Sequence, residues 1–274
     1  MTVIRRTVAL AGMAIVWALA PSVSAQWPPH PTPGVPRLAD GKPNLAAPAP
    51  RLPDGKPDFS GLWQNRGGGG RDAKPPEPPP GQPPLAMFWN IGAGFKDDLP
   101  LQPWARELRA TRMSTESKDN PDAHCLPMGM MQFHTHPQPR QIVQTANLML
   151  IVYEANYGLR KIYLDGRPAP GNDPQPWWYG YSRGRWDGDT LIVETTNFRD
   201  GEWLDVNGSP LTDAATVTER YRRPNFGQIE IDVTIDDPKA YTRPWTVRLN
   251  QYVMVDSELI EFICHENQRF VPLP

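Results

Sequence analysis

From about residue 140 onward, apolar and polar residues alternate with a period of two. The run from Gln228 to Asp236 alternates without interruption, and Trp245, Val247 and Leu249 mark one apolar face of the run that follows. Such alternation is typical of strands that bury one face and expose the other. The second half of the chain is therefore predicted to be built from strands.

Short turn signals separate these runs. They are Asn156-Tyr157-Gly158, Asp165-Gly166, Asp187-Gly188, Asn207-Gly208, Asn225-Phe226-Gly227 and Asp256-Ser257. Their spacing predicts eight or nine antiparallel strands joined mostly by hairpins, the last over residues 259–264. Because no β-α-β rhythm appears, a parallel sheet is not expected.

An antiparallel succession of this length has to protect its edges, and closure is the usual solution. We therefore expect a mainly β protein, either a lipocalin-like (calycin-type) barrel or a strongly curved sheet. A two-sheet β-sandwich is the alternative. The segment Phe59-Ser60-Gly61-Leu62-Trp63 resembles the Gly-x-Trp motif that opens lipocalin barrels.

The chain divides into three parts. A basic start, an apolar run and a small-residue site before position 26 predict a signal peptide over residues 1–25, and hence export to the periplasm or the extracellular space. Residues 26–84 contain 17 prolines and predict an extended or disordered arm, in which Phe59 and Trp63 are the residues expected to dock. Residues 85–274 are expected to form one β-rich domain that begins with a short helix over residues 103–117.

Export bears on the only two cysteines, Cys125 and Cys264. An oxidising compartment favours a disulfide between them, with two buried free thiols as the alternative. The net charge of −2 offers no field for phosphates, so nucleic acid is not expected as a partner. No later segment is apolar enough to span a bilayer, and the oligomeric state stays open.

Several motifs together resemble a family of exported bacterial proteins of unknown function. They are Asp54-Gly-Lys-Pro-Asp-Phe-Ser-Gly-Leu-Trp63, Cys125-Leu-Pro127, Gln141-Ile-Val-Gln-Thr145, Gly184-Arg-Trp-Asp-Gly-Asp-Thr-Leu-Ile-Val193, Glu219-Arg-Tyr-Arg222, Asp236-Asp-Pro238, Tyr241-Thr-Arg-Pro-Trp245 and Glu261-Phe-Ile-Cys-His-Glu-Asn267. The resemblance implies secretion and the pairing of Cys125 with Cys264. It implies no catalytic residue and no substrate.

An aromatic cluster is the candidate ligand site. Trp177, Trp178, Tyr179 and Tyr181 concentrate large rings, which often line small-molecule pockets. Two further candidates complete the predicted ligand-binding set, Tyr221 and Arg248. The alternative is that these rings plug one end of the barrel.

Two weaker constellations concern catalysis and metal binding. Glu219 lies among apolar neighbours, which raises the pKa of a carboxyl and suits acid–base catalysis, although pairing with an arginine such as Arg248 is the commoner arrangement. His134 and His136 point the same way if their segment is extended, and the predicted disulfide brings His265 and Glu266 near them. The alternative is a loop with solvated imidazoles.

The sequence therefore favours an exported β-barrel-like protein that binds a small molecule and needs no cofactor. One alternative is a hydrolase or isomerase that uses Glu219 or the site at His134, His136 and His265. Another is an interaction protein that acts through its proline-rich arm. Motifs for a phosphate loop, a dinucleotide site or a serine nucleophile elbow are absent from the sequence.

Overall fold

The structure is a computed structural model, and it describes residues 31–65, 70–171, 176–264 and 266. The chain divides into two units, Met1–His30 and Pro31–Pro274, and everything below concerns the second. The expected signal peptide over residues 1–25 and the candidate ligand His265 lie outside the described residues.

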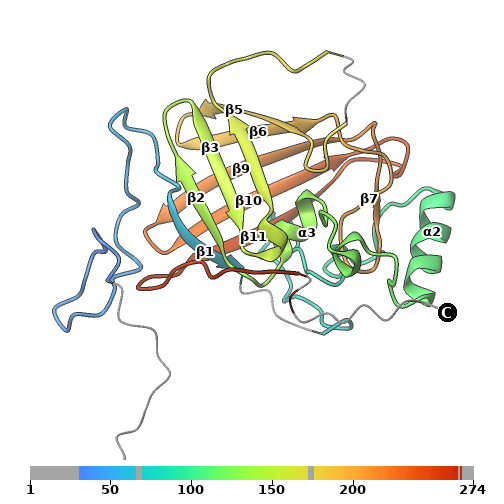
Figure 1. Cartoon of the computed structure of the whole chain (residues 1–274), viewed down its shortest axis with the longest axis horizontal. Coiled ribbons are helices and arrows are strands. Elements are labelled where there is room, and N and C mark those ends of the chain that lie inside the picture. The colour runs from blue at the N-terminus through green and yellow to red at the C-terminus, as the bar shows by residue number, and fades with distance from the viewer. Residues whose placement is uncertain (1–30, 66–69, 172–175, 265, 267–274) are drawn as a thin grey trace, which may run out of the picture. The chain divides into compact units, whose positions relative to one another are not determined.

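Nine strands form a closed barrel (Figure 1). They are β1 (Gly61–Asn65), β2 (Arg140–Gln144), β3 (Leu148–Tyr153), β4 (Leu159–Tyr163), β5 (Tyr181–Asp187), β6 (Thr190–Thr196), β9 (Thr216–Asn225), β10 (Gln228–Asp236) and β11 (Trp245–Val253). Each strand pairs with the next barrel strand along the chain, and β1 pairs with both β2 and β11 to complete the ring. The predicted mainly β barrel is confirmed, and the two-sheet sandwich is wrong.

One pair of strands departs from the antiparallel pattern. β4 and β5 run parallel and are joined only through Ile162 with Ser182 and Tyr163 with Arg183. The other pairs around the ring are antiparallel. β7 (Glu202–Trp203) and β8 (Pro210–Leu211) form a small separate sheet, and in the sequence they lie between β6 and β9.

The alternation of the sequence places the apolar core inside the barrel. Along β10, Ile229, Ile231, Val233 and Ile235 are buried, and the residues between them are more exposed. This pattern agrees with the alternation predicted for residues 228–236. Burial of these side chains away from water is the main force that closes the ring.

In the part of the chain that the structure describes, two short α-helices accompany the barrel. α2 (Pro103–Ser114) begins at the proline expected to open a helix, and it contacts β8. α3 (Met130–Thr135) was not predicted, and all of its side chains are buried. The carbonyl of His134 accepts a hydrogen bond from Gln251 of β11, and the carbonyl of Thr135 accepts one from Asn65 of β1. Helix α3 therefore closes one end of the barrel (Figure 1).

Two one-turn 3-10 helices, η1 (Pro121–His124) and η2 (Ala155–Tyr157), lie in the connections. None of the helices in the described part of the chain is both long and apolar enough to cross a membrane.

The range expected for the arm, residues 26–84, contains β1, which pairs within the barrel. The prolines on both sides conceal this five-residue strand, although no proline falls inside it. Phe59 and Trp63 do dock, and both are fully buried. The guanidinium of Arg223 lies 4.7 Å from the centroid of the Trp63 ring, and its Nη1 donates to the carbonyl of Asp58.

The strand expected over residues 259–264 is not formed, and β11 ends at Val253. β11 pairs with β10 on one side and with β1 on the other, so it has no free edge for another strand. The disulfide between Cys125 and Cys264 is present, with 5.7 Å between the two Cα atoms. It fastens the segment after β11 to the loop between η1 and α3.

Candidate functional site

The interior of the barrel holds a buried carboxylate, Glu219 of β9. Arg160 of β4 binds it through both terminal nitrogens, and Arg160 Nη1 lies 2.9 Å from Glu219 Oε1. The hydroxyl of Tyr221 donates to the same oxygen at 2.8 Å. The two charged side chains are 2% and 0% exposed, so water does not screen them. Glu219 and Arg160 therefore form a bidentate ion pair in the core.

His134 of α3 completes this arrangement. Its Nε2 lies 2.8 Å from Arg160 Nη1 and 2.9 Å from Glu219 Oε1. Burial lowers the pKa of His134, so the ring is neutral at pH 7. Burial acts to raise the pKa of Glu219, but Arg160 and His134 outweigh it and hold that pKa well below its usual range. This direction is opposite to the one that a general acid would need.

Two hydroxyl groups accept the remaining donors of Arg160. Ser182 Oγ of β5 lies 3.1 Å from its Nε, and Thr195 Oγ1 of β6 lies 2.9 Å from its Nη2. Arg160 thereby connects four strands, β4, β5, β6 and β9, and helix α3. The sequence does hold a signal for the buried position of Arg160, because Arg160 shares the inward face of β4 with Ile162, two residues further on. A charged residue on an apolar face needs a buried partner.

Of the histidines expected to bind a metal, the structure describes His134 and His136, and it does not bring these two together. Residues 130–135 are helical rather than extended, so His134 and His136 diverge. His134 enters the barrel, whereas the ring of His136 packs edge-on against Phe88 at 4.8 Å between centroids. Glu266 is exposed. Within the described residues, no group of three or more His, Cys, Asp or Glu side chains is placed to hold a metal ion.

Residues 177–181, which we call the aromatic turn, lead into β5, and Tyr181 is the first residue of that strand. The N–H of Gly180 bonds to the carbonyl of Trp177, and Gly180 has φ of 64°, a conformation that glycine adopts without strain. The chain therefore folds back before it enters β5. This brings Tyr181 into a stack with Tyr163 of β4 at 5.2 Å, and Trp177 lies 5.5 Å from Tyr181.

A pocket of about 430 Å³ lies between the aromatic turn and the outward side of β4. Its lining consists of residues 177–182, residues 159–161 and Tyr163. The four aromatic residues predicted from the sequence all line it, and each is half-buried. The guanidinium of Arg199 lies 4.1 Å from the Trp178 ring, which holds that ring in place at the rim. The aromatic turn thus forms one wall of a pocket, and its Tyr179 also packs against the core, with 5.3 Å between its ring centroid and that of Phe133 of α3.

The two other predicted ligand-binding residues lie elsewhere. Tyr221 is fully buried in the interior network beside Glu219. Arg248 of β11 pairs with Asp232 of β10, at 2.6 Å between Nε and Oδ1, rather than with Glu219. It lines a separate cavity of about 290 Å³. The structure therefore does not bring these two residues to the aromatic turn.

Glu202 of β7 is a buried carboxyl that sequence reasoning missed. It is 5% exposed, and its Oε2 accepts no hydrogen bond. Burial raises the pKa of Glu202 to about 8, which nearby Arg199 opposes only in part.

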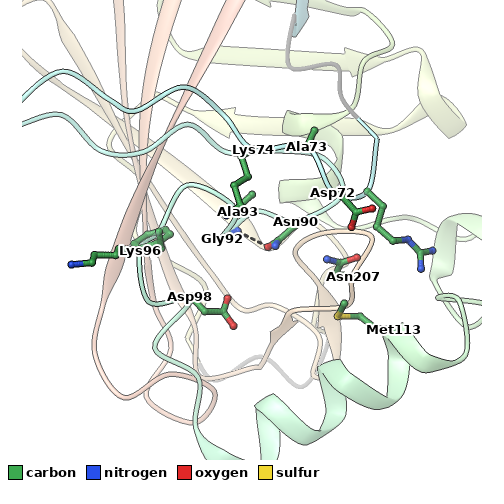
Figure 2. Close-up of a pocket in the computed structure, with 12 residues that line it drawn as sticks. Asp72, Ala73, Lys74, Asn90, Gly92, Ala93, Lys96, Asp98, Met113 and Asn207 are labelled. Atoms are coloured by element: carbon green, nitrogen blue, oxygen red, sulfur yellow. Dashed lines mark hydrogen bonds between the residues drawn. The ribbon is translucent and has the colours of Figure 1, made fainter.

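A further cavity of about 460 Å³ lies among the loops beside α2 (Figure 2). Charges of both signs line it, including Lys74 and Asp98. Asp98 is paired with Arg109 of α2, which together with Arg106 holds the pKa of Asp98 below its usual value in spite of partial burial. None of the residues predicted from the sequence as site residues lines this cavity.

No protein-family model matches this chain, and neither the curated proteins nor the solved structures contain a match to it.

Proposed function

We propose that this protein binds a small aromatic molecule in the pocket between the aromatic turn and β4. The observation that carries the proposal is the convergence of Trp177, Trp178, Tyr179 and Tyr181 on one pocket. Half-buried rings present large flat surfaces whose stacking with a planar ligand costs little side-chain entropy. The volume of about 430 Å³ falls in the range of small-molecule sites.

The ligand in this proposal lies against the outer side of the barrel wall. Leu159, Lys161 and Tyr163 of β4 alternate with the buried Arg160 and Ile162, so they face outward. The interior at this level is occupied by Arg160, Glu219 and His134. A ligand held inside the barrel has to displace this ion pair, whereas one beside the aromatic turn does not.

We also propose that the barrel is lipocalin-like and that the protein is exported. The Gly61–Trp63 motif lies at the start of β1, where lipocalin barrels carry it. The disulfide between Cys125 and Cys264 agrees with an oxidising compartment.

The test of binding uses N-phenyl-1-naphthylamine, a neutral aromatic probe whose fluorescence rises when it leaves water. We expect saturable binding to the wild-type protein. Trp178→Ala should weaken it about fivefold or more, because a stacking surface of the pocket is removed. Trp104→Ala is the matched control, since Trp104 is 45% exposed on α2 and does not line the pocket. Equal losses in both variants, or no saturable binding, would contradict the proposal.

A further inference from the structure

A second cavity of about 470 Å³ adjoins the aromatic pocket along the outer side of the barrel wall. Tyr163 lines both cavities, and its ring stacks on Tyr181 at 5.2 Å. The second cavity lies over β4, β5, β6 and β9. The two cavities are therefore neighbours that share the side chain of Tyr163.

Three arginines line this second cavity, Arg167, Arg183 and Arg185, against one carboxylate, Glu194. Arg183 and Arg185 alternate with Gly184 on β5 and so share its outward face. We call this cavity the arginine cavity. Its excess of positive charge favours an anionic group.

The arginines differ in how far their charge is already compensated. Arg167 is paired with Asp165, and its guanidinium lies 3.8 Å from the Tyr163 ring. Arg183 Nη2 bonds to Glu194 Oε1 at 2.6 Å, but its Nε–H is buried without an acceptor. Arg185 is exposed, and no described residue forms an ion pair with it.

The guanidinium groups of Arg183 and Arg185 lie on outward positions of one strand, and of the two only Arg183 is paired with a described carboxylate, so together they suit an oxyanion. A carboxylate, sulfonate or phosphate group accepts from guanidinium nitrogens with a geometry that matches their planar fork.

We propose that the ligand is an aromatic anion, with its ring in the aromatic pocket and its acidic group in the arginine cavity at Arg183 and Arg185. This inference rests on the proposed function and narrows it to a class of ligand. The sharing of Tyr163 by the two cavities carries the inference, because one molecule then meets both the rings and the positive charge.

The experiment compares two probes that differ by one sulfonate, 1-anilinonaphthalene-8-sulfonate and the neutral N-phenyl-1-naphthylamine. We expect the anionic probe to bind the wild-type protein about tenfold more tightly than the neutral one. Arg185→Gln should remove most of this advantage and leave the affinity for the neutral probe unchanged. Glu194→Gln should have the opposite effect and strengthen binding of the anionic probe.

Arg220→Gln is the matched control for the loss of charge. Arg220 is exposed on the outward face of neighbouring β9, pairs with Asp187 and does not line the arginine cavity. At physiological ionic strength its removal should change the affinity for the anionic probe less than about twofold.

The possible outcomes separate the two proposals. If the neutral probe binds and the anionic probe has no advantage, or if Arg220→Gln weakens it as much as Arg185→Gln, the aromatic pocket stands and the anion site is wrong. Binding of the anionic probe that is unaffected by Trp178→Ala contradicts one continuous site. If neither probe binds, both proposals fail.

Discussion

Replacement of Arg160 by methionine tests the role of the interior network most directly. The variant leaves Glu219 in the core with hydrogen bonds only to Tyr221, at 2.8 Å, and to His134, at 2.9 Å. Because Glu219 is fully buried, no water replaces the guanidinium. A buried charge that loses its partner costs about 3–5 kcal/mol of folding free energy, and we expect Arg160→Met to destabilise the protein by this amount at pH 7.

The cost should depend on pH in a definite direction. In the wild-type protein the pKa of Glu219 lies well below its usual value, so its stabilising effect is present above the unfolded pKa of about 4.5 and is lost as the pH falls toward the folded pKa. Without Arg160, burial raises that pKa, so the carboxylate is an increasing penalty above about pH 4.5. The difference between the two proteins should therefore be largest near neutrality and shrink below about pH 4.5.

Urea unfolding of the disulfide-bonded protein, followed by circular dichroism, measures this difference. The double variant Arg160→Met/Glu219→Leu removes both charges and should regain at least about 2 kcal/mol relative to Arg160→Met. Arg220→Met is the control for an exposed pair and should cost about 0.5 kcal/mol or less. A loss below about 1 kcal/mol for Arg160→Met, or a double variant as unstable as the single one, would refute the reasoning.

Three further predictions concern other parts of the chain. Thiol labelling of the denatured, unreduced protein should find no free thiol at Cys125 or Cys264, and labelling of both would contradict the disulfide. Reduction of the disulfide should lower the free energy of unfolding by about 4–5 kcal/mol in the loop-entropy model, and with it the melting temperature. The pKa of about 8 at Glu202 means that the folded state binds the extra proton between about pH 4.5 and 8, so stability falls with rising pH in that window. Glutamine does not titrate, so the stability of Glu202→Gln relative to the wild type, measured by urea unfolding, should rise by a few kcal/mol from pH 5 to pH 8. A stability difference that stays constant over this range would refute the raised pKa of Glu202. Gly180→Ala places a Cβ 2.5 Å from Thr195 Cγ2 at a φ of 64°. We therefore expect this variant to be about 1–3 kcal/mol less stable than the wild type and to bind N-phenyl-1-naphthylamine more weakly. Gly188→Ala is the control and should leave binding unchanged, because no atom lies within 4 Å of its Cβ.

The sequence predicted the barrel well wherever the alternation was regular. The segments that form β9, β10 and β11 could be identified because each buries every second residue. The alternation failed at residues 259–264, because a period of two shows that a segment can be a strand but not whether a free edge remains for it. β1 was concealed by the prolines around it, although its five residues include none.

The candidate site could be predicted only in part. The aromatic turn was visible because large rings close together in sequence stay close in space. Arg160 and Glu219 are 59 positions apart, and nothing local indicates which arginine a buried carboxylate will meet. The histidines were misplaced because one turn of helix at α3 changes the period from two to 3.6 and separates His134 from His136.

The number of strands in the barrel has a consequence for the aromatic turn. In a closed ring, strand directions can alternate without exception only if the number of strands is even, and this ring has nine. At least one neighbouring pair must then run in the same direction, and that pair is β4 and β5. Two strands that run the same way cannot be joined by a tight hairpin, so the chain needs a long return connection from the end of one to the start of the other. The described residues of that connection, 164–171 and 176–180, include Arg167 and all of the aromatic turn except Tyr181. The odd number of strands thus requires a long connection between β4 and β5, and its described residues supply part of the proposed ligand site beside these strands.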